Sequence, residues 1–117
     1  MRLPIGLALG APNRLPEAFG AIDWSQPSML TFEPPDPKTF RCLALAYDAG
    51  RAGGTAPAVL SAANEIAVEA FLNRRITFLQ ISQMVRRALE RHQVVPHPTL
   101  DQILAADAWA RQAAAQG

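Results

Sequence analysis

Two glutamates one helical turn apart, Glu65 and Glu69, come nearest to the spacing of a catalytic or metal-binding pair. Paired carboxylates can bind a divalent metal or transfer protons. A di-metal site in a helical bundle would also use a Glu-x-x-His motif, which this sequence does not contain. We therefore expect one glutamate to be solvated, while Asn64 and Glu65 hydrogen-bond to backbone groups of a nearby loop or of the N-terminal segment.

A glycine-rich loop runs from Arg51 to Thr55 and leads into an apolar stretch with helical spacing. Free amides at the start of a helix can bind a phosphate group. However, the loop lacks the Gly-Lys-Ser/Thr ending of a P-loop, and no strand is expected before it. We interpret it as a tight turn between two helices, with Thr55 as the helix cap.

The remaining reactive side chains do not form a recognisable site. Cys42 lies in an apolar run, where cysteine usually packs as a small hydrophobic residue. His92 could act as a base, but no carboxylate to orient it and no oxyanion donor is evident. His92 and His97 lie in or beside a proline-containing loop and lack metal-ligand spacing. We therefore assign no catalytic, cofactor-binding or metal-binding residue from these patterns.

The charge balance argues against nucleic acid and membranes as partners. The chain of 117 residues carries a formal net charge of +1, so no basic footprint is present. We therefore expect Arg86, Arg87 and Arg91 to form a solvated helix face. No apolar run approaches the ~20 residues of a membrane span. The single cysteine excludes an intramolecular disulfide and fits a reducing cytoplasm.

The chain divides near residue 36. Residues 1–36 contain six of the ten prolines, and proline disrupts helices because it lacks an amide proton and clashes with the preceding turn. This part is therefore expected to be a connecting segment that lies on another surface. It has room for a short helix over residues 2–9 and a short strand near residues 30–33.

Residues 37–117 are expected to form a separate domain of four helices. Short connections between the helices favour an antiparallel, up-down bundle. The fold class is therefore mainly α, with the central helix from about Thr55 to Asn73 the most buried. The helices are expected from Pro37, after a cap at Asp36, to Gly50; from Thr55 to Asn73; from Leu79 to His92; and onward from Thr99, whose capping box pairs it with Gln102.

Several short motifs then occur in a familiar order along the chain. They are Met1-Arg2-Leu3-Pro4-Ile5, Pro12-Asn13-Arg14, Leu30-Thr31-Phe32, Phe40-Arg41-Cys42-Leu43, Gly53-Gly54-Thr55, Val59-Leu60-Ser61-Ala62-Ala63-Asn64-Glu65 and Ile76-Thr77-Phe78-Leu79-Gln80-Ile81. With this order and spacing, the chain resembles the C-terminal part of 1-deoxy-D-xylulose 5-phosphate reductoisomerases over essentially its whole length. The Ala-Ala-Asn-Glu motif is the most specific portion of the resemblance.

The resemblance implies an enzyme of the non-mevalonate isoprenoid pathway. Such enzymes convert 1-deoxy-D-xylulose 5-phosphate to 2-C-methyl-D-erythritol 4-phosphate, using NADPH and Mg²⁺ or Mn²⁺. They have an N-terminal dinucleotide-binding domain, a catalytic domain, a connecting segment and a C-terminal helical domain. They are typically cytoplasmic homodimers. The partners implied for this chain are therefore the missing N-terminal and catalytic domains.

Compared residue by residue with the family, this chain lacks the catalytic machinery. The glycine-rich dinucleotide motif, the metal-binding Asp-x-Glu and the phosphate-binding residues have no counterpart here. Only Met1 matches a family position close to substrate and cofactor, as a wall of the active site. We therefore expect a fragment that supports an enzyme structurally and is inactive alone, with Met1 an internal methionine or the chain one part of a split enzyme. The alternative is a stand-alone helical protein-interaction module; nucleic-acid binding ranks below both.

Overall fold

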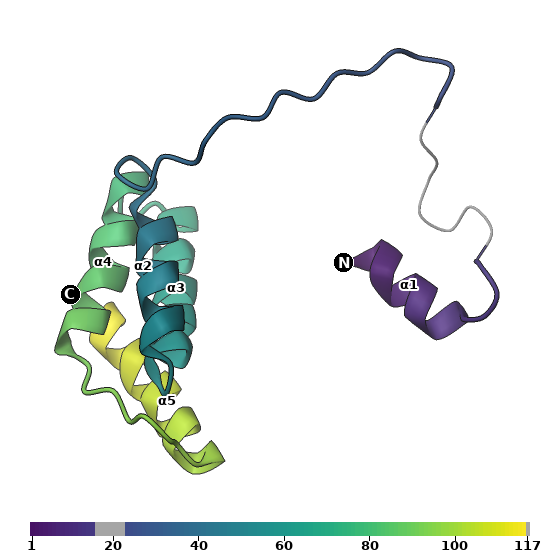
Figure 1. Cartoon of the computed structure of the whole chain (residues 1–117). Coiled ribbons are helices and arrows are strands. Elements are labelled where there is room, and N and C mark those ends of the chain that lie inside the picture. Colours follow the sequence, from purple (N-terminus) through teal and green to yellow (C-terminus); the bar gives the residue numbers. More distant parts are fainter. Residues whose placement is uncertain (16–22, 117) are drawn as a thin grey trace. The chain divides into compact units, whose positions relative to one another are not determined.

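The described residues, 1–15 and 23–116 of a computed structural model, form five helices and no strand (Figure 1). The prediction of a mainly α fold is confirmed. The chain separates into two units, residues 1–33 and 34–117. The helices are α1 (Arg2–Gly10), α2 (Arg41–Ala52), α3 (Ala56–Leu72), α4 (Phe78–Arg91) and α5 (Leu100–Ala115).

The first unit contains α1, close to the short helix expected over residues 2–9. Pro4 is tolerated because it lies in the first turn, where the amide has no partner within the helix. Gly6 is the one buried residue of α1, while apolar side chains on all sides of the helix remain at least half exposed. They are Leu3, Ile5, Leu7 and Leu9. The described part of this unit therefore has no hydrophobic core of its own.

The strand expected near residues 30–33 is not formed, so this prediction was wrong. The segment has no regular secondary structure, and Leu30 and Phe32 are 80% and 87% exposed. A strand exists only when its backbone groups bond to a neighbouring strand. The described residues offer this segment no such neighbour, although its composition suits an extended conformation.

Helix α3 is the centre of the second unit and the most buried helix, as expected. Val59, Ala62, Ala63 and Ala67 are fully buried, and the helix packs against α2, α4 and α5. Alanine side chains are small, so α4 and α5 can approach α3 closely on two sides (Figure 1). The core therefore consists of close helix contacts with few large side chains.

Helix α2 begins four residues later than expected because Asp36 stabilises a turn there. Its carboxylate Oδ1 accepts hydrogen bonds from the amides of Lys38 (2.9 Å) and Thr39 (3.1 Å), and its carbonyl accepts one from Phe40 (2.9 Å). The hydroxyl of Thr39 and these amides lower the pKa of Asp36. Pro37 therefore lies in a turn, and the helix starts only at Arg41.

The other helix ends follow local capping rules. Helix α2 continues past Gly50 and ends at Ala52, because Gly53 takes the positive φ of 65° that stops it. The capping box predicted at the start of α5 is confirmed, with the Thr99 amide donating to Gln102 Oε1 at 2.9 Å. Helix α4 has a similar box at Thr77, which was not anticipated.

Helix α3 ends at a position where glycine would be favoured. Arg74 has a φ of +58°, and its amide donates to the Phe71 carbonyl, while the Arg75 amide donates to the Ala70 carbonyl. This pair of bonds is the Schellman pattern. A side chain in the left-handed region costs about 1–2 kcal/mol.

Replacing Arg74 by glycine is expected to stabilise the chain. Removing the backbone strain stabilises the folded chain, and the greater entropy of glycine in the unfolded chain offsets part of this effect. The expected net gain in the free energy of unfolding is about 1 kcal/mol. Asn73, with a φ of −81°, provides the control. Urea unfolding followed by circular dichroism should show a higher free energy of unfolding for Arg74→Gly and a lower one for Asn73→Gly. Equal losses for both variants would contradict this account of the turn.

Candidate functional site

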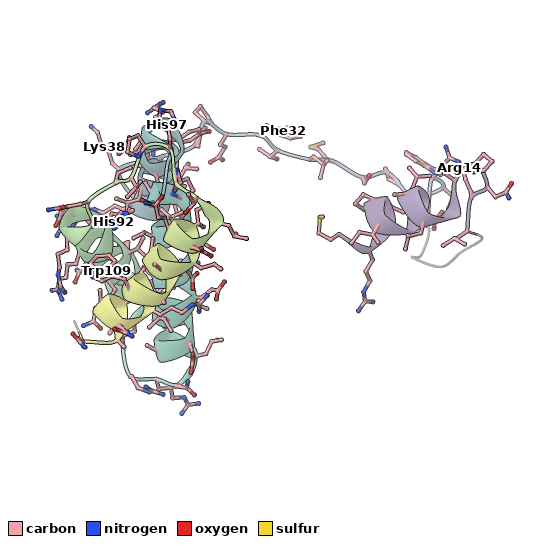
Figure 2. All side chains as sticks on the ribbon, turned by 90° about the horizontal axis from the view of Figure 1, so that it is seen from below. Arg14, Phe32, Lys38, His92, His97 and Trp109 are labelled. Carbon is pink, nitrogen blue, oxygen red and sulfur yellow. The ribbon has the colours of Figure 1, made fainter. Side chains whose placement is uncertain are left out.

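A buried polar junction joins the start of α3 to the connection between α4 and α5. Thr55 is fully buried, and its Oγ1 lies 2.7 Å from His92 Nε2. The same oxygen accepts the Val95 amide at 3.0 Å, and the Thr55 amide donates to the Val95 carbonyl at 3.2 Å. The His92 ring also lies 5.3 Å from the Trp109 ring of α5, centroid to centroid (Figure 2). Three separate segments meet at this junction.

The hydrogen bonds of the junction hold the His92 ring in position. Thr55 has one hydroxyl proton, and Val95 already uses one acceptor position of the oxygen. Thr55 Oγ1 can therefore either donate its proton to His92 Nε2 or accept one from it, and the tautomer of the ring decides which. Burial also lowers the pKa of His92. His92 thus has a structural role, and the hollow beside it contains no carboxylate among its lining residues.

The glycine loop before α3 forms a turn and its amides are occupied. The Gly53 amide donates to the Ala49 carbonyl, the Thr55 amide to Val95, and the Ala56 amide to Gly53. These amides are therefore not available to hold a phosphate. Thr55 does precede α3, but its side chain makes no helix-capping hydrogen bond. That part of the prediction was wrong, because the hydroxyl bonds to His92 and Val95 instead.

Glu65 belongs to an ion-pair network between α3 and α5. Its Oε2 lies 2.8 Å from Arg111 Nη2, and Arg111 Nε lies 2.7 Å from Asp107 Oδ2. The hydrogen bonds that Arg111 donates to Asp107 and, to a lesser extent, to Glu65 raise the pKa of Arg111. The expectation that Glu65 bonds to backbone groups was wrong, since its carboxylate forms an ion pair with Arg111 of α5 instead. The network does not include Glu69.

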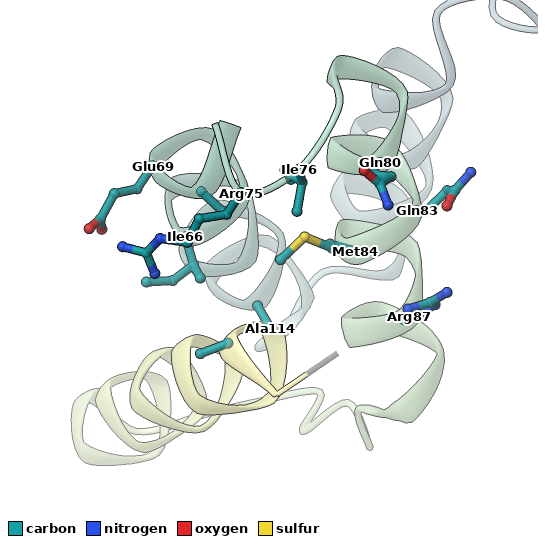
Figure 3. A pocket seen from close by; sticks show the side chains of 11 residues that line it. Ile66, Glu69, Arg75, Ile76, Gln80, Gln83, Met84, Arg87 and Ala114 are labelled. Carbon is teal, nitrogen blue, oxygen red and sulfur yellow. The ribbon is translucent and has the colours of Figure 1, made fainter. Parts of the chain in front are cut away.

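Glu69 lies on the rim of a hollow of about 300 Å³ between α3, α4 and the end of α5. Met84 points from α4 into this hollow, toward Ala114 on α5 (Figure 3). Arg75 lies on the same side of the rim as Glu69. The alanines of α5 leave this space unfilled, because their side chains are too short to reach Met84 and Ile76.

The other candidate residues lie apart from these clusters. Met1 precedes α1 and is 91% exposed. Partial burial raises the pKa of the Cys42 thiol, which disfavours the reactive thiolate. On the exposed face of α4, Arg86 pairs with Glu90 at 3.8 Å. Within residues 1–15 and 23–116, no group of three or more His, Cys, Asp or Glu side chains is placed to hold a metal ion.

Sequence reasoning missed both polar clusters, the Thr55 junction and the Glu65–Arg111–Asp107 network. Thr55 is separated from His92 and Val95 by 37 and 40 residues, so no local pattern links them. The Asp107–Arg111 pair, by contrast, has the i, i+4 spacing of a helical ion pair and could have been recognised. What these clusters can do chemically is limited to positioning helices.

Comparison with known proteins gives a consistent result. The family model described as the DXP reductoisomerase C-terminal domain matches residues 1–113. The 1-deoxy-D-xylulose 5-phosphate reductoisomerase of Thermodesulfovibrio yellowstonii is 48% identical over 114 residues, which cover 97% of this chain and 30% of that protein. No helix in the described residues has the length and apolar character needed to cross a membrane.

Two solved structures are also similar. The Zymomonas mobilis reductoisomerase in complex with NADPH has a TM-score of 0.83 and 38% identity, over 98% of this chain and 30% of that one. A DOX-P reductoisomerase in complex with magnesium has a TM-score of 0.79 and 35% identity, over 97% of this chain and 30% of that one. The chain thus spans about 30% of the length of the relatives it matches.

The junction predicts opposite effects for two glycine substitutions. A Cβ at Gly54 would lie 2.1 Å from the Val95 carbonyl oxygen, and its φ is +55°, so Gly54→Ala should displace the loop and cost about 3 kcal/mol. A Cβ at Gly50 meets nothing within 4 Å. Gly50→Ala should therefore add about 0.5–1 kcal/mol through helix propensity. Urea unfolding measures both, and an equal response at the two positions would exclude a close approach at Gly54.

Stability should depend on pH through His92. In the folded chain its pKa is lowered, so below about 6.5 the unfolded chain binds more protons and folding becomes less favourable. The free energy of unfolding should fall as the pH decreases from 7.5 through this range, and the loss should be complete below the folded pKa.

Two variants separate this effect from other titrations. His92→Gln should remove the pH dependence between neutral pH and the range where carboxylates titrate, whereas His97→Gln should retain it. Urea unfolding at a series of pH values provides the measurement. A wild-type chain whose stability varies no more than that of His92→Gln would show that the junction does not control His92.

Proposed function

The chain belongs to the 1-deoxy-D-xylulose 5-phosphate reductoisomerase family, and we propose that it supplies the C-terminal part of such an enzyme. In this role it supports the catalytic domain and carries out no chemistry itself. The observation that carries the proposal is the match of residues 1–113 to the family's C-terminal domain, by a chain that spans about 30% of its relatives. The remaining domains of the enzyme are its partners.

The activity of the assembled enzyme follows from the family. We propose that it converts 1-deoxy-D-xylulose 5-phosphate to 2-C-methyl-D-erythritol 4-phosphate, a step of isoprenoid biosynthesis, as a cytoplasmic homodimer. When bound, NADPH would supply a hydride and a divalent metal would polarise substrate oxygens. The solved relatives bind NADPH in one case and magnesium in another.

The donor groups that the structure describes do not fit either cofactor. Glu65 forms an ion pair with Arg111 at 2.8 Å. Among the described residues, the carboxylates do not form a group of three or more potential metal ligands. The amides of Gly53, Thr55 and Ala56 donate to backbone carbonyls. These observations support the proposal that the metal and NADPH are held by residues outside this chain.

The two parts of the chain have different supporting roles in this proposal. Residues 1–36 would act as the connecting segment, whose exposed apolar side chains become covered by the rest of the enzyme, with Met1 in the wall of the active site. Met29, Leu30 and Phe32 are at least 80% exposed, which supports this role. Residues 37–117, with their own core, would form the C-terminal helical domain.

A chimera tests the proposal. This chain replaces the matching segment of the Thermodesulfovibrio yellowstonii relative, and NADPH oxidation is measured with 1-deoxy-D-xylulose 5-phosphate and Mg²⁺. The chimera should be active within about tenfold of the relative, equivalent to about 1.4 kcal/mol in the barrier. The 117-residue chain alone and the relative without its matching segment should be inactive. Activity of the isolated chain, or a folded but inactive chimera, would refute the proposal.

A further inference from the structure

A groove of about 250 Å³ opens where the starts of α2 and α4 face the middle of α3. It lies wholly within the second unit. Its lining is mostly apolar and includes Phe40, Cys42, Asn64, Val68, Phe78 and Leu79. These residues define what we call the α2–α4 groove.

Local capping determines which side chains flank this groove. The Asp36 turn ends at Phe40, so this ring lies just before α2. The capping box at Thr77 makes Phe78 the first residue of α4. Phe78 also contacts Phe71 edge to face at 5.7 Å, which restrains its ring. The flanking side chains are therefore positioned before any partner arrives.

The apolar rim of the groove is exposed. Phe40 is 63% exposed, Phe78 67% and Leu79 71%. Single exposed apolar residues are common, but three around one groove mark an interaction surface. Covering such side chains contributes about 25 cal/mol for each Å² removed from water.

Asn64 adds a specific polar feature to the groove. It lies on an exposed face in the middle of α3, and its side chain makes no hydrogen bond within the described residues. A side-chain amide offers one acceptor and two donor protons, which match the N–H and C=O groups of a peptide unit. The groove therefore combines apolar walls with a group that can bond to a polypeptide backbone.

We propose that the α2–α4 groove binds an extended, apolar segment of the remaining part of the enzyme. Its side chains lie between Phe40 and Phe78, and one of its peptide groups bonds to Asn64. This inference rests on the proposed function. Because this chain spans only about 30% of its relatives, most of the polypeptide that can cover the groove lies outside it.

Cys42 is a built-in reporter for this contact. It is the only cysteine of the chain, it lines the groove, and it is exposed. Iodoacetamide labelling of Cys42 is followed by peptide mass spectrometry in the isolated chain and in the chimera. In the chimera, labelling should slow by at least about tenfold, the factor that 1.4 kcal/mol of docking provides.

Variants of the chimera test the groove directly. Leu79→Ser and Asn64→Ala should each make Cys42 more reactive, because they weaken the apolar and the polar contact. Leu100→Ser is the matched control, since Leu100 is 70% exposed, close to the 71% of Leu79, but does not line the groove. It should leave the labelling rate unchanged.

The outcomes distinguish this inference from the proposed function. An active chimera in which Cys42 is labelled as fast as in the isolated chain overturns the groove proposal and leaves the function intact. An inactive chimera with a protected Cys42 supports the groove and counts against the activity. If Cys42 is already labelled slowly in the isolated chain, the proposal is overturned, because the chain itself or a second copy then covers the groove. This holds whether or not the labelling rate depends on the protein concentration.

Discussion

The arrangement of the helical unit depends on the buried hydroxyl of Thr55. This group bonds to His92 and Val95, two residues of one segment that is distant from Thr55 in sequence. Breaking either bond would leave a polar group unsatisfied in a buried position, which costs about 1–3 kcal/mol. The start of α3 and the connection between α4 and α5 therefore hold each other in place.

Helix α5 needs such polar contacts because its apolar face is made of alanines. Ala106, Ala110 and Ala114 pack against the core but bury little area each. The position of α5 is further defined by the Trp109 ring against His92 and by the Arg111 ion pair with Glu65 on α3. These polar and aromatic contacts determine how α5 lies on α3, while the alanines allow the two helices to come close.

Sequence periodicity and caps predicted α3, α4 and α5 to within about two residues, because those signals are local. The start of α2 was missed because Asp36 can stabilise a turn as well as a helix start. The strand near residues 30–33 could not be judged locally, since pairing requires a neighbour. For the candidate site, the sequence favoured a structural role for Glu65 and Glu69 over a catalytic one, which stays a prediction, and it gave no sign that Glu65 pairs with Arg111.

The fully buried alanines of α3 also limit how this domain can vary. Ala62, Ala63 and Ala67 have no exposed surface and belong to the buried core, against which larger side chains such as Leu45 and Met84 pack. A larger residue at one of these positions would overpack the core, so that neighbouring side chains or a whole helix would have to shift. Displacing α5 would also move Trp109, whose ring lies against His92 of the Thr55 junction. Substitutions that add volume are therefore expected on the outer surface of the bundle, while the buried positions of α3 keep side chains as small as alanine.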